Sequence, residues 1–336
     1  MPECVGVIGA GSWGTALACL LGQKQKRVWL WGRNTERIAR LQQEHINRQY
    51  LPEAILPDTV CPTTELSVLQ ECWIWVLAVP SSAIRAVVAQ LPDAAPLCVI
   101  AAKGLEPGTG KRLSEVVLES GRWHPTQVGV LSGPNLAVEL VRGIPTATVA
   151  AAYALESAEC VQELFMTPTL RVYTNDDVVG VELGGALKNV YAIGAGMSDG
   201  LGFGNNTKGT LLTRGLAEMM RLGTALGACA ETFIGLTGVG DLFATSVSPL
   251  SRNYRLGYAV ARGKSPDQAL QEIGQVAEGY PTALVAQSLA QSHGIETPVL
   301  DAVADILKGV RSVPDALQSL MTRPPKGERE FRLVQA

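Results

Sequence analysis

Residues Cys4-Val5-Gly6-Val7-Ile8-Gly9-Ala10-Gly11-Ser12-Trp13-Gly14 join a short, β-rich apolar run directly to a glycine-rich turn. Residues 13–23 have the composition of a helix, and residues 27–31 form a second apolar run typical of a strand. The order strand, Gly-x-Gly-x-x-Gly, helix and strand within about 30 residues is the context in which this motif indicates dinucleotide binding. The alternative, a glycine-rich turn in some other α/β protein, is disfavoured by that context.

The three glycines have separate physical tasks in such a turn. Gly9 allows the tight turn, Gly11 lets a pyrophosphate approach the main chain, and Gly14 lets helix and strand pack closely. The N-terminus of the helix then presents free N–H groups and a positive dipole end to the phosphates. Gly9, Gly11 and Gly14 are therefore candidate cofactor-binding residues.

The end of the second strand bears on the choice of cofactor. It carries Gly32-Arg33-Asn34, with no acid before Glu36. A site specific for NAD usually places Asp or Glu here for the ribose 2′-hydroxyl, whereas an arginine accepts a 2′-phosphate. Arg33 therefore predicts NADP(H) and leaves use of NAD(H) open. A solvated arginine at a strand end is the alternative.

The same alternation continues through the first half of the chain. Further strands are predicted at 73–79, 97–102, 128–131, 146–151 and 170–173. We therefore expect an α/β fold whose first domain, residues 1–177, is a Rossmann-type, doubly wound and mostly parallel sheet. Ligands of such sheets lie outside the carboxyl ends of the strands. Lys103 and the turn 133–135, which follow two of these strands, are thus expected at the edge that carries the glycine turn. A surface lysine is the alternative for Lys103.

No convincing strand follows residue 178, so residues 178–336 are predicted to form a helical domain for substrate binding and catalysis. Residues 265–268, Ser-Pro-Asp-Gln, form a capping box for one of its helices. A glycine-rich loop is predicted at 235–245 around Asp241. Residues 249–255 open another helix with a hydroxyl, an arginine and an amide, which suits an anion. The alternative for Asp241 is a side chain that only caps a helix, and the alternative for Arg252 is a solvated side chain.

Lys188 lies in the small and apolar run 181–191, at the point where the pattern changes from alternating to helical. Gly184 and Gly185 each cost about 1 kcal/mol relative to Ala inside a helix, so a close neighbour is expected. Lysine is rarely buried, and snorkelling to solvent is the alternative to a place in a site.

Composition excludes several classes of function. A chain of 336 residues with 47% hydrophobic and 18% charged residues is expected to form a globular protein of two domains. Its net charge of −3 gives no electrostatic case for a nucleic acid. Seven cysteines without a Cys-x-x-Cys pair, and three histidines, favour reduced thiols and no zinc site. We expect no membrane segment, because no apolar run reaches about 18 residues. With a strand from Val5 there is no room for a signal peptide, and we expect a cytoplasmic protein.

Five motifs carry a resemblance to a known family. They are Gly9-Ala10-Gly11-Ser12-Trp13-Gly14, Ser132-Gly133-Pro134-Asn135, Gly185-Ala186-Leu187-Lys188-Asn189, Gly238-Val239-Gly240-Asp241 and Ser251-Arg252-Asn253. Together, and over most of the chain, they resemble the bacterial NAD(P)-dependent glycerol-3-phosphate dehydrogenases. The resemblance implies interconversion of sn-glycerol 3-phosphate and dihydroxyacetone phosphate, a soluble homodimer, and a role at the start of glycerophospholipid synthesis.

The resemblance also implies roles for single residues. Lys188 is the implied general acid/base, and Lys103 helps to polarise the carbonyl. The other implied substrate contacts are Gly133, Asn135, Asn189, Asp241, Thr245, Ser251, Arg252 and Asn253, the last three at the phosphate. Beyond the glycines, the implied cofactor contacts are Ser12, Trp13, Arg33, Tyr50, Lys103, Ala137, Arg252, Val276 and Glu278. Two positions depart from the family: Asn135 stands where Ser or Thr is common, and Asn34 where a second basic residue is frequent.

A proton donor for carbonyl reduction works best with a pKa near 7 to 8, which a lysine reaches by burial or beside a like charge. Lys103 and Lys188 are expected to lower each other's pKa if they meet. Two rival functions stay open. A β-hydroxyacid dehydrogenase of the same architecture needs a carboxylate site rather than the phosphate-like run 251–253. A cofactor-binding sensor without turnover has no need of both lysines and Asp241.

Overall fold

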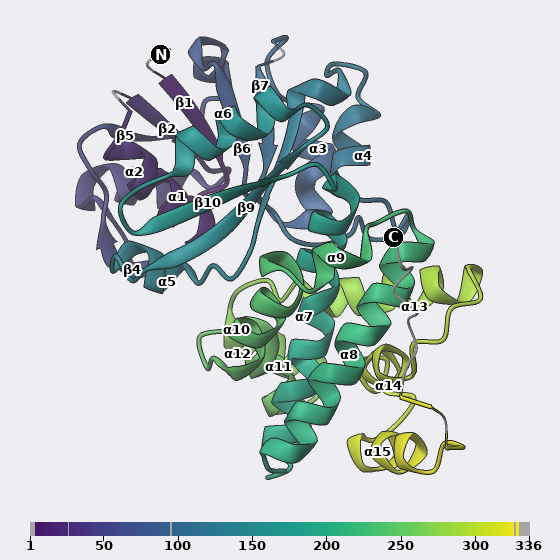
Figure 1. The fold of residues 1–336 in the computed structure, drawn as a ribbon. Helices are drawn as coiled ribbons and strands as arrows, with labels where there is room; N and C mark the ends of the chain where they lie inside the picture. The colour runs from purple at the N-terminus through teal and green to yellow at the C-terminus, as the bar shows by residue number, and fades with distance from the viewer. Residues whose placement is uncertain (1–3, 26, 95, 326, 329–336) are drawn as a thin grey trace.

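The computed structural model describes residues 4–25, 27–94, 96–325 and 327–328. Figure 1 shows two lobes, one built around a twisted sheet and the other made of helices. The chain passes from the first to the second between β10, which ends at Asn175, and α7, which begins at Val178.

Eight strands form the sheet of the first lobe, in the order β10-β9-β8-β7-β6-β1-β2-β5. They are β1 Cys4–Ile8, β2 Arg27–Trp31, β5 Val60–Thr63, β6 Ile74–Leu77, β7 Leu97–Ile100, β8 Val128–Ser132, β9 Thr146–Ala152 and β10 Leu170–Asn175. All neighbours are parallel except β8 and β9, so β9 and β10 run against the rest. This confirms the mostly parallel sheet.

The strand order places a crevice beside the glycine turn. From β1 the chain builds outward through β2 and β5, and then crosses to β6 on the other side of β1. Such a topological switch point is where open α/β sheets bind ligands. Because β1, β6, β7 and β8 are parallel, their carboxyl ends share one edge. Lys103 and residues 133–135, which follow β7 and β8, therefore lie at the edge that carries the glycine turn, as expected.

Helices cover both faces of the sheet, which explains the continuous apolar runs of its strands. Val5 and Val7 pack into the cluster on one face, and Ile8 and Trp75 into the cluster on the other. The helices are α1 Ser12–Gly22, α2 Thr35–Glu44, α3 Ile84–Val88, α4 Leu113–Leu118, α5 Ala137–Val141 and α6 Leu155–Phe165. Short 3-10 turns are η1 Ser67–Glu71, η2 Ser81–Ala83 and η3 Pro125–Gln127, and β3 Ile46–Asn47 pairs with β4 Leu51–Ile55 in a separate hairpin.

The second lobe is organised around α7 Val178–Gly200, which is buried over nearly all of its length. Around it lie α8 Asn205–Ala225, α9 Ala230–Phe233, the π-helical turn η4 Leu236–Gly240, α10 Asp241–Val247, α11 Arg252–Ala261, α12 Pro266–Ile273, α13 Gly279–Ser292, α14 Pro298–Leu307 and α15 Val313–Met321. The closest neighbour is α11: a Cβ on Gly257 would lie 1.9 Å from the carbonyl oxygen of Ile193. Only glycine allows this approach of two helix backbones.

Several local expectations were wrong or incomplete. Residues 235–245 are not a loop, because the glycines permit a π-helical turn that leads directly into α10. The predicted strand at 73–79 is the shorter β6, Ile74–Leu77, and only its carboxyl end lies at the crevice. No sequence pattern had indicated α2, β5 or the β3–β4 hairpin. In the described part of the chain no single helix is long and apolar enough to cross a membrane; the bent pair Ala230–Val247 and Arg252–Ala261 reaches that length only together.

Candidate active site

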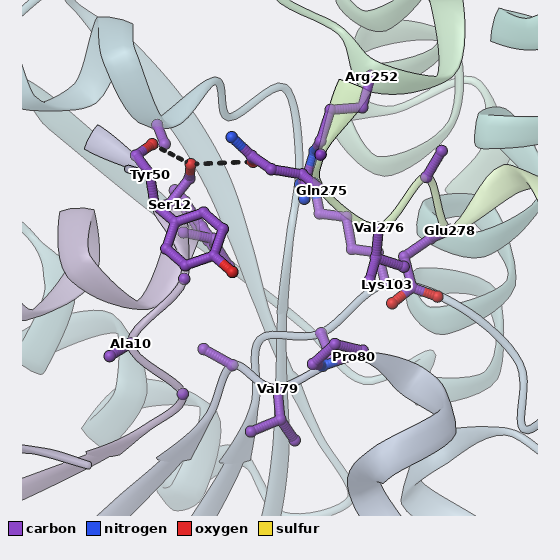
Figure 2. A pocket seen from close by; sticks show the side chains of 18 of the residues that line it. Ala10, Ser12, Tyr50, Val79, Pro80, Lys103, Arg252, Gln275, Val276 and Glu278 are labelled. Atoms are coloured by element: carbon purple, nitrogen blue, oxygen red, sulfur yellow. Dashed lines mark hydrogen bonds between the residues drawn. The ribbon is translucent and has the colours of Figure 1, made fainter. Parts of the chain in front are cut away.

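A cleft of about 1070 Å³ lies between the two lobes. The glycine turn and the ends of β2, β6 and β7 line one side, and α7, the start of α11 and the loop 274–278 line the other. Figure 2 shows Ala10 and Val79 on the first side and Arg252, Gln275 and Glu278 on the second. Of the predicted site residues, Gly14, Gly133 and Asp241 do not line the cleft directly, and all the others do.

The glycine turn fits a bound pyrophosphate. Gly9 has a φ of +124°, and a Cβ there would lie 2.7 Å from the main chain of Ala78 at the end of β6. A Cβ on Gly14 would lie 1.8 Å from the carbonyl oxygen of Gly9, so the helix seats directly on the turn. A Cβ on Gly11 would have nothing within 4 Å, because this face is open to the cleft. Gly11 caps α1 without a side chain, so the first N–H groups of the helix are available to an anion.

Two side chains at the start of α1 tie the turn to its surroundings. The Ser12 hydroxyl donates to the main-chain oxygen of Tyr50 and lies 3.4 Å from Oε1 of Gln275, which reaches over from the helical lobe (Figure 2). Trp13 donates from Nε1 to the carbonyl of Ala101, at the end of β7, over 3.0 Å. The start of α1 is therefore fixed against both lobes.

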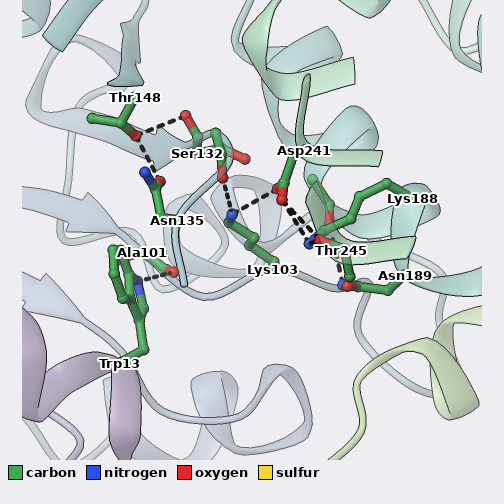
Figure 3. A network of polar contacts seen from close by, with 12 residues as sticks. Trp13, Ala101, Lys103, Ser132, Asn135, Thr148, Lys188, Asn189, Asp241 and Thr245 are labelled. Atoms are coloured by element: carbon green, nitrogen blue, oxygen red, sulfur yellow. Dashed lines mark hydrogen bonds and ion pairs between the residues drawn. The ribbon is translucent and has the colours of Figure 1, made fainter. Parts of the chain in front are cut away.

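Lys188, Lys103 and Asp241 form a buried network on the helical side of the cleft (Figure 3). Lys188 Nζ donates to Asp241 Oδ1 over 2.8 Å and to Thr245 Oγ1 over 2.5 Å. Lys103 Nζ donates to the other carboxylate oxygen, Oδ2, over 2.7 Å and to the carbonyl of Gly133 over 2.6 Å. The exposed fractions of the Lys188 and Asp241 side chains are 7% and 2%, so Lys188 does not snorkel to solvent.

The charges of the network set its protonation. The pKa of Lys188 is lowered to about 8, mainly by burial; Asp241 opposes this shift, and the positive charges of Lys103 and Arg252 add to it. Burial acts to raise the pKa of Asp241, but the two ammonium groups outweigh it and hold that pKa below its usual value. The expected encounter of the two lysines thus takes place through a shared carboxylate, and burial is the larger cause of the Lys188 shift.

The paired glycines of α7 make room for this network. A Cβ on Gly184 would lie 2.8 Å from the carbonyl oxygen of Thr237, and one on Gly185 would lie 2.5 Å from the Ser132 hydroxyl. The close neighbours expected from the sequence are therefore the π-helical turn and the end of β8. A Cβ on Gly185 would also lie 3.6 Å from the Lys103 side chain, so α7 can bring Lys188 beside a residue of the sheet lobe.

The start of α11 lines the helical side of the cleft. The hydroxyl of Ser251 caps the helix by accepting from the N–H of Tyr254 over 3.2 Å. Both polar atoms of the Asn253 amide have partners: the nitrogen donates to Asn189 Oδ1 over 2.8 Å, and the oxygen accepts from the N–H of Gly279 over 2.9 Å. Arg252 is half-buried here, and burial lowers its pKa, while Glu278 and Tyr50 partly offset the shift.

The remaining predicted contacts lie around the same cleft. Glu278 accepts from the N–H of Ser81 over 2.9 Å and from its hydroxyl over 2.5 Å, which joins the two lobes. Asn135 donates to the carbonyl of Ala147 and accepts from the Thr148 hydroxyl, so it packs against β9 while lining the cleft. Ala137 starts α5, and Val276 lies in the loop 274–278.

Sequence reasoning missed two cross-lobe partners, Ser81 and Gln275, and a third residue, Arg37. Ser81 had a signal, because it opens a helix at the carboxyl end of a strand. Gln275 follows the left-handed Gly274 that ends α12, and nothing local singles it out. Among the described residues no group of three or more His, Cys, Asp or Glu side chains is placed to hold a metal ion.

Comparisons with known proteins agree with this geometry. Residues 4–158 match the model for the N-terminus of NAD-dependent glycerol-3-phosphate dehydrogenase, and residues 177–318 match the model for its C-terminus. The chain is 46% identical over 334 residues to the NAD(P)+-dependent glycerol-3-phosphate dehydrogenase of Moorella thermoacetica, covering 98% of this chain and 99% of the relative. The solved structure of glycerol-3-phosphate dehydrogenase from Coxiella burnetii superposes with a TM-score of 0.91 at 38% identity, over 96% of this chain and 99% of the other. A yeast glycerol-3-phosphate dehydrogenase superposes with a TM-score of 0.78 at 26% identity, over 95% and 99% of the chains.

Proposed function

Because the chain belongs to the NAD(P)-dependent glycerol-3-phosphate dehydrogenase family, we propose that it works mainly as a reductase of dihydroxyacetone phosphate with NADPH. The product is sn-glycerol 3-phosphate. The observation that carries this proposal is the buried Lys188–Asp241–Lys103 network at the bottom of an interlobe cleft. The proposed preference for NADPH rests on Arg33 at the end of β2, because the first acid after that strand, Glu36, does not line the cleft.

The nicotinamide cofactor supplies the hydride when it is bound, and the protein has to orient the reactants and manage one proton. The residues placed to hold it are the glycine turn, Ser12, Trp13 and Arg33. Lys188 gives its proton to the carbonyl oxygen as the alkoxide develops, and a pKa of about 8 suits this transfer near neutral pH. The ammonium group of Lys103 stabilises the same negative charge.

Asp241 has a positioning role in this proposal. Both of its oxygens are occupied by lysines, so it fixes the two ammonium groups at one place and keeps Lys188 charged despite burial. The resemblance implied a contact with the glycerol end of the substrate; the geometry favours Lys188 and Thr245 for that contact, because Asp241 does not line the cleft.

Arg252 and the start of α11 are proposed to bind the substrate phosphate. Ser251 satisfies one N–H group of the first turn, and those of Arg252 and Asn253 are left to an anion by the geometry of a helix N-terminus. The guanidinium of Arg252 adds a charge-assisted bond. Since its amide is engaged within the protein, Asn253 would contribute through its main chain.

The physiological setting is proposed from the family alone. We place the enzyme in the cytoplasm, as a homodimer that supplies sn-glycerol 3-phosphate for glycerophospholipid synthesis. Light scattering of the purified protein tests the dimer, and a mass of one chain would contradict it.

The decisive experiment measures oxidation of NADPH and of NADH with dihydroxyacetone phosphate, beside oxidation with matching β-keto acids. We expect turnover with dihydroxyacetone phosphate and a higher kcat/KM for NADPH than for NADH. Turnover only with a keto acid would contradict the proposed substrate and support a β-hydroxyacid dehydrogenase. Binding of NADPH without turnover of any substrate would support a cofactor-binding sensor.

The first prediction concerns the phosphate. Arg252→Ala should raise KM for dihydroxyacetone phosphate and also lower kcat, because binding energy away from the reacting carbon helps to position it. Arg262→Ala is the matched control, since Arg262 is an exposed arginine at the C-terminal end of α11 that does not line the cleft. Steady-state kinetics that are unchanged in folded Arg252→Ala would remove Arg252 from the site.

A further inference from the structure

The end of the cleft beyond β2 holds a second cation besides Arg33, and the family resemblance did not include it. Arg37 lies in the first turn of α2, lines the cleft and is half-buried. Its guanidinium carbon lies 4.6 Å from the centroid of the Tyr50 ring. Arg33 lines the same end and is exposed. Among the described residues neither arginine has a carboxylate partner.

The position of Arg37 is fixed from two sides. The Asn34 side chain caps α2 by accepting from the main-chain N–H of Arg37 over 2.8 Å. On the other side, the ring of Tyr50 supports the guanidinium through a cation–π contact. The main-chain oxygen of Tyr50 accepts from Ser12 at the start of α1. Arg37 is therefore held relative to the glycine turn rather than free to swing in solvent.

Several other charged side chains that line the cleft already have partners. Arg48 Nε lies 2.5 Å from Glu44 Oε2. Glu53 lies 3.9 Å from Arg142, and Glu278 accepts two hydrogen bonds from Ser81. The uncompensated charge at the end beyond β2 is therefore positive, and it comes from Arg33 and Arg37.

We propose that Arg37 is the second cation of the 2′-phosphate subsite and, with Arg33, sets the preference for NADP(H). A phosphomonoester carries a charge of about −1.5 to −2 near neutral pH, so one exposed arginine does not neutralise it. Asn34 cannot supply the second charge, because it is neutral and its oxygen caps the helix. The same hydrogen bond from the Asn34 cap fixes the main chain of Arg37 in the first turn of α2. This inference rests on the proposed use of NADPH.

The test is calorimetric titration of the whole enzyme with adenosine 2′,5′-bisphosphate and with AMP, which differ only in the 2′-phosphate. Arg37→Gln should weaken binding of the bisphosphate roughly tenfold, the usual effect of one hydrogen bond to a charged group. Binding of AMP should change by less than about twofold, since this charge is not near the 5′-phosphate. Arg37→Lys should fall between, because lysine keeps the charge but loses the planar fork.

Arg40→Gln is the matched control, since Arg40 is an exposed arginine of the same helix that does not line the cleft. Arg37→Gln that binds the bisphosphate like the wild type, or that loses both ligands equally, overturns the assignment of Arg37 alone. A wild-type enzyme that binds the bisphosphate no better than AMP overturns the proposed cofactor preference as well.

Discussion

Lys188 shows how far a single side chain depends on its neighbours. Its ammonium group is buried and has a carboxylate and a hydroxyl as partners. Burial makes the neutral form easier to reach, and Asp241 keeps the charged form available. These opposing effects leave the pKa at about 8, where a proton can be given and taken back near neutral pH.

Lys188→Met keeps the length of the side chain and removes its proton and charge. We expect turnover to fall by about 10²–10⁴-fold for the loss of proton transfer. Binding of NADPH, followed by its fluorescence, should stay near normal, because the glycine turn and Arg33 are untouched. Lys264→Met, at an exposed lysine that does not line the cleft, serves as control. A folded Lys188→Met enzyme with near-normal kcat would refute the proposed acid.

The pH dependence of the two directions follows from the same pKa. Reduction needs protonated Lys188, so its rate should fall as the pH rises through about 8, while oxidation of glycerol 3-phosphate should gain. Asp241→Asn removes a charge that raises this pKa, so the falling limb of reduction should move to lower pH. A limb that stays in place in Asp241→Asn would show that another group titrates.

At the scale of elements, glycine positions decide which backbones can meet. Gly14 seats α1 on the turn after β1, and Gly257 brings α11 against α7. Caps decide where helices begin: Asn34 starts α2, and Ser251 starts α11. Both capped helices begin at the cleft, so their first turns position the arginines proposed to bind the two phosphates.

Asn34→Ala should therefore affect both stability and cofactor binding. Loss of an N-cap costs about 1 kcal/mol, within a range of about 0.5–2, and should appear in urea unfolding followed by circular dichroism. Frayed α2 would also release Arg37, which should weaken NADPH more than NADH. Asn34→Ser, which can still cap, should restore both properties. If Asn34→Ala is as stable as the wild type, the cap has no energetic role.

At the scale of the whole molecule, buried carboxylates of the helical lobe hold separate elements together. Glu182 of α7 accepts from the main chain of Ser114 over 2.8 Å and from Arg112 over 2.9 Å, which joins this helix to α4 of the sheet lobe. Glu218 of α8 accepts from the first N–H groups of α14, at Val299 and Leu300. Burial raises the pKa of Glu218 to about 7, although these hydrogen bonds act to lower it.

This raised pKa predicts the direction of a stability change. The folded protein holds the Glu218 proton more tightly than the unfolded chain, so the contribution is complete below about pH 4.5 and is lost as the pH rises towards 7. We expect the stability of the wild type relative to Glu218→Gln to decrease over this window. Urea unfolding of both proteins at several pH values measures it, and the difference cancels other titrating groups. A constant difference would contradict the raised pKa.

The sequence by itself determined the elements whose signals are local. Glycine spacing between two strands located the cofactor turn, and apolar runs without polar alternation indicated strands buried on both faces. The Ser-Pro-Asp-Gln cap placed the start of α12, as observed. Motif order indicated the family and most of the residues that line the cleft. Each of these signals depends on residues a few positions apart, because backbone preferences and the periodicity of apolar side chains are local properties of the sequence.

Only the tertiary structure decided how distant residues combine. Lys103 and Asp241 are 138 positions apart, and they meet because the strand order puts β7 at the cleft and the packing of α10 brings its first turn there. The burial that lowers the pKa of Lys188 comes from two lobes at once. Arg37 joins the cleft because Asn34 caps its helix and Tyr50 supports its guanidinium. Such contacts depend on sheet order and on the docking of the lobes, and no local pattern specifies either.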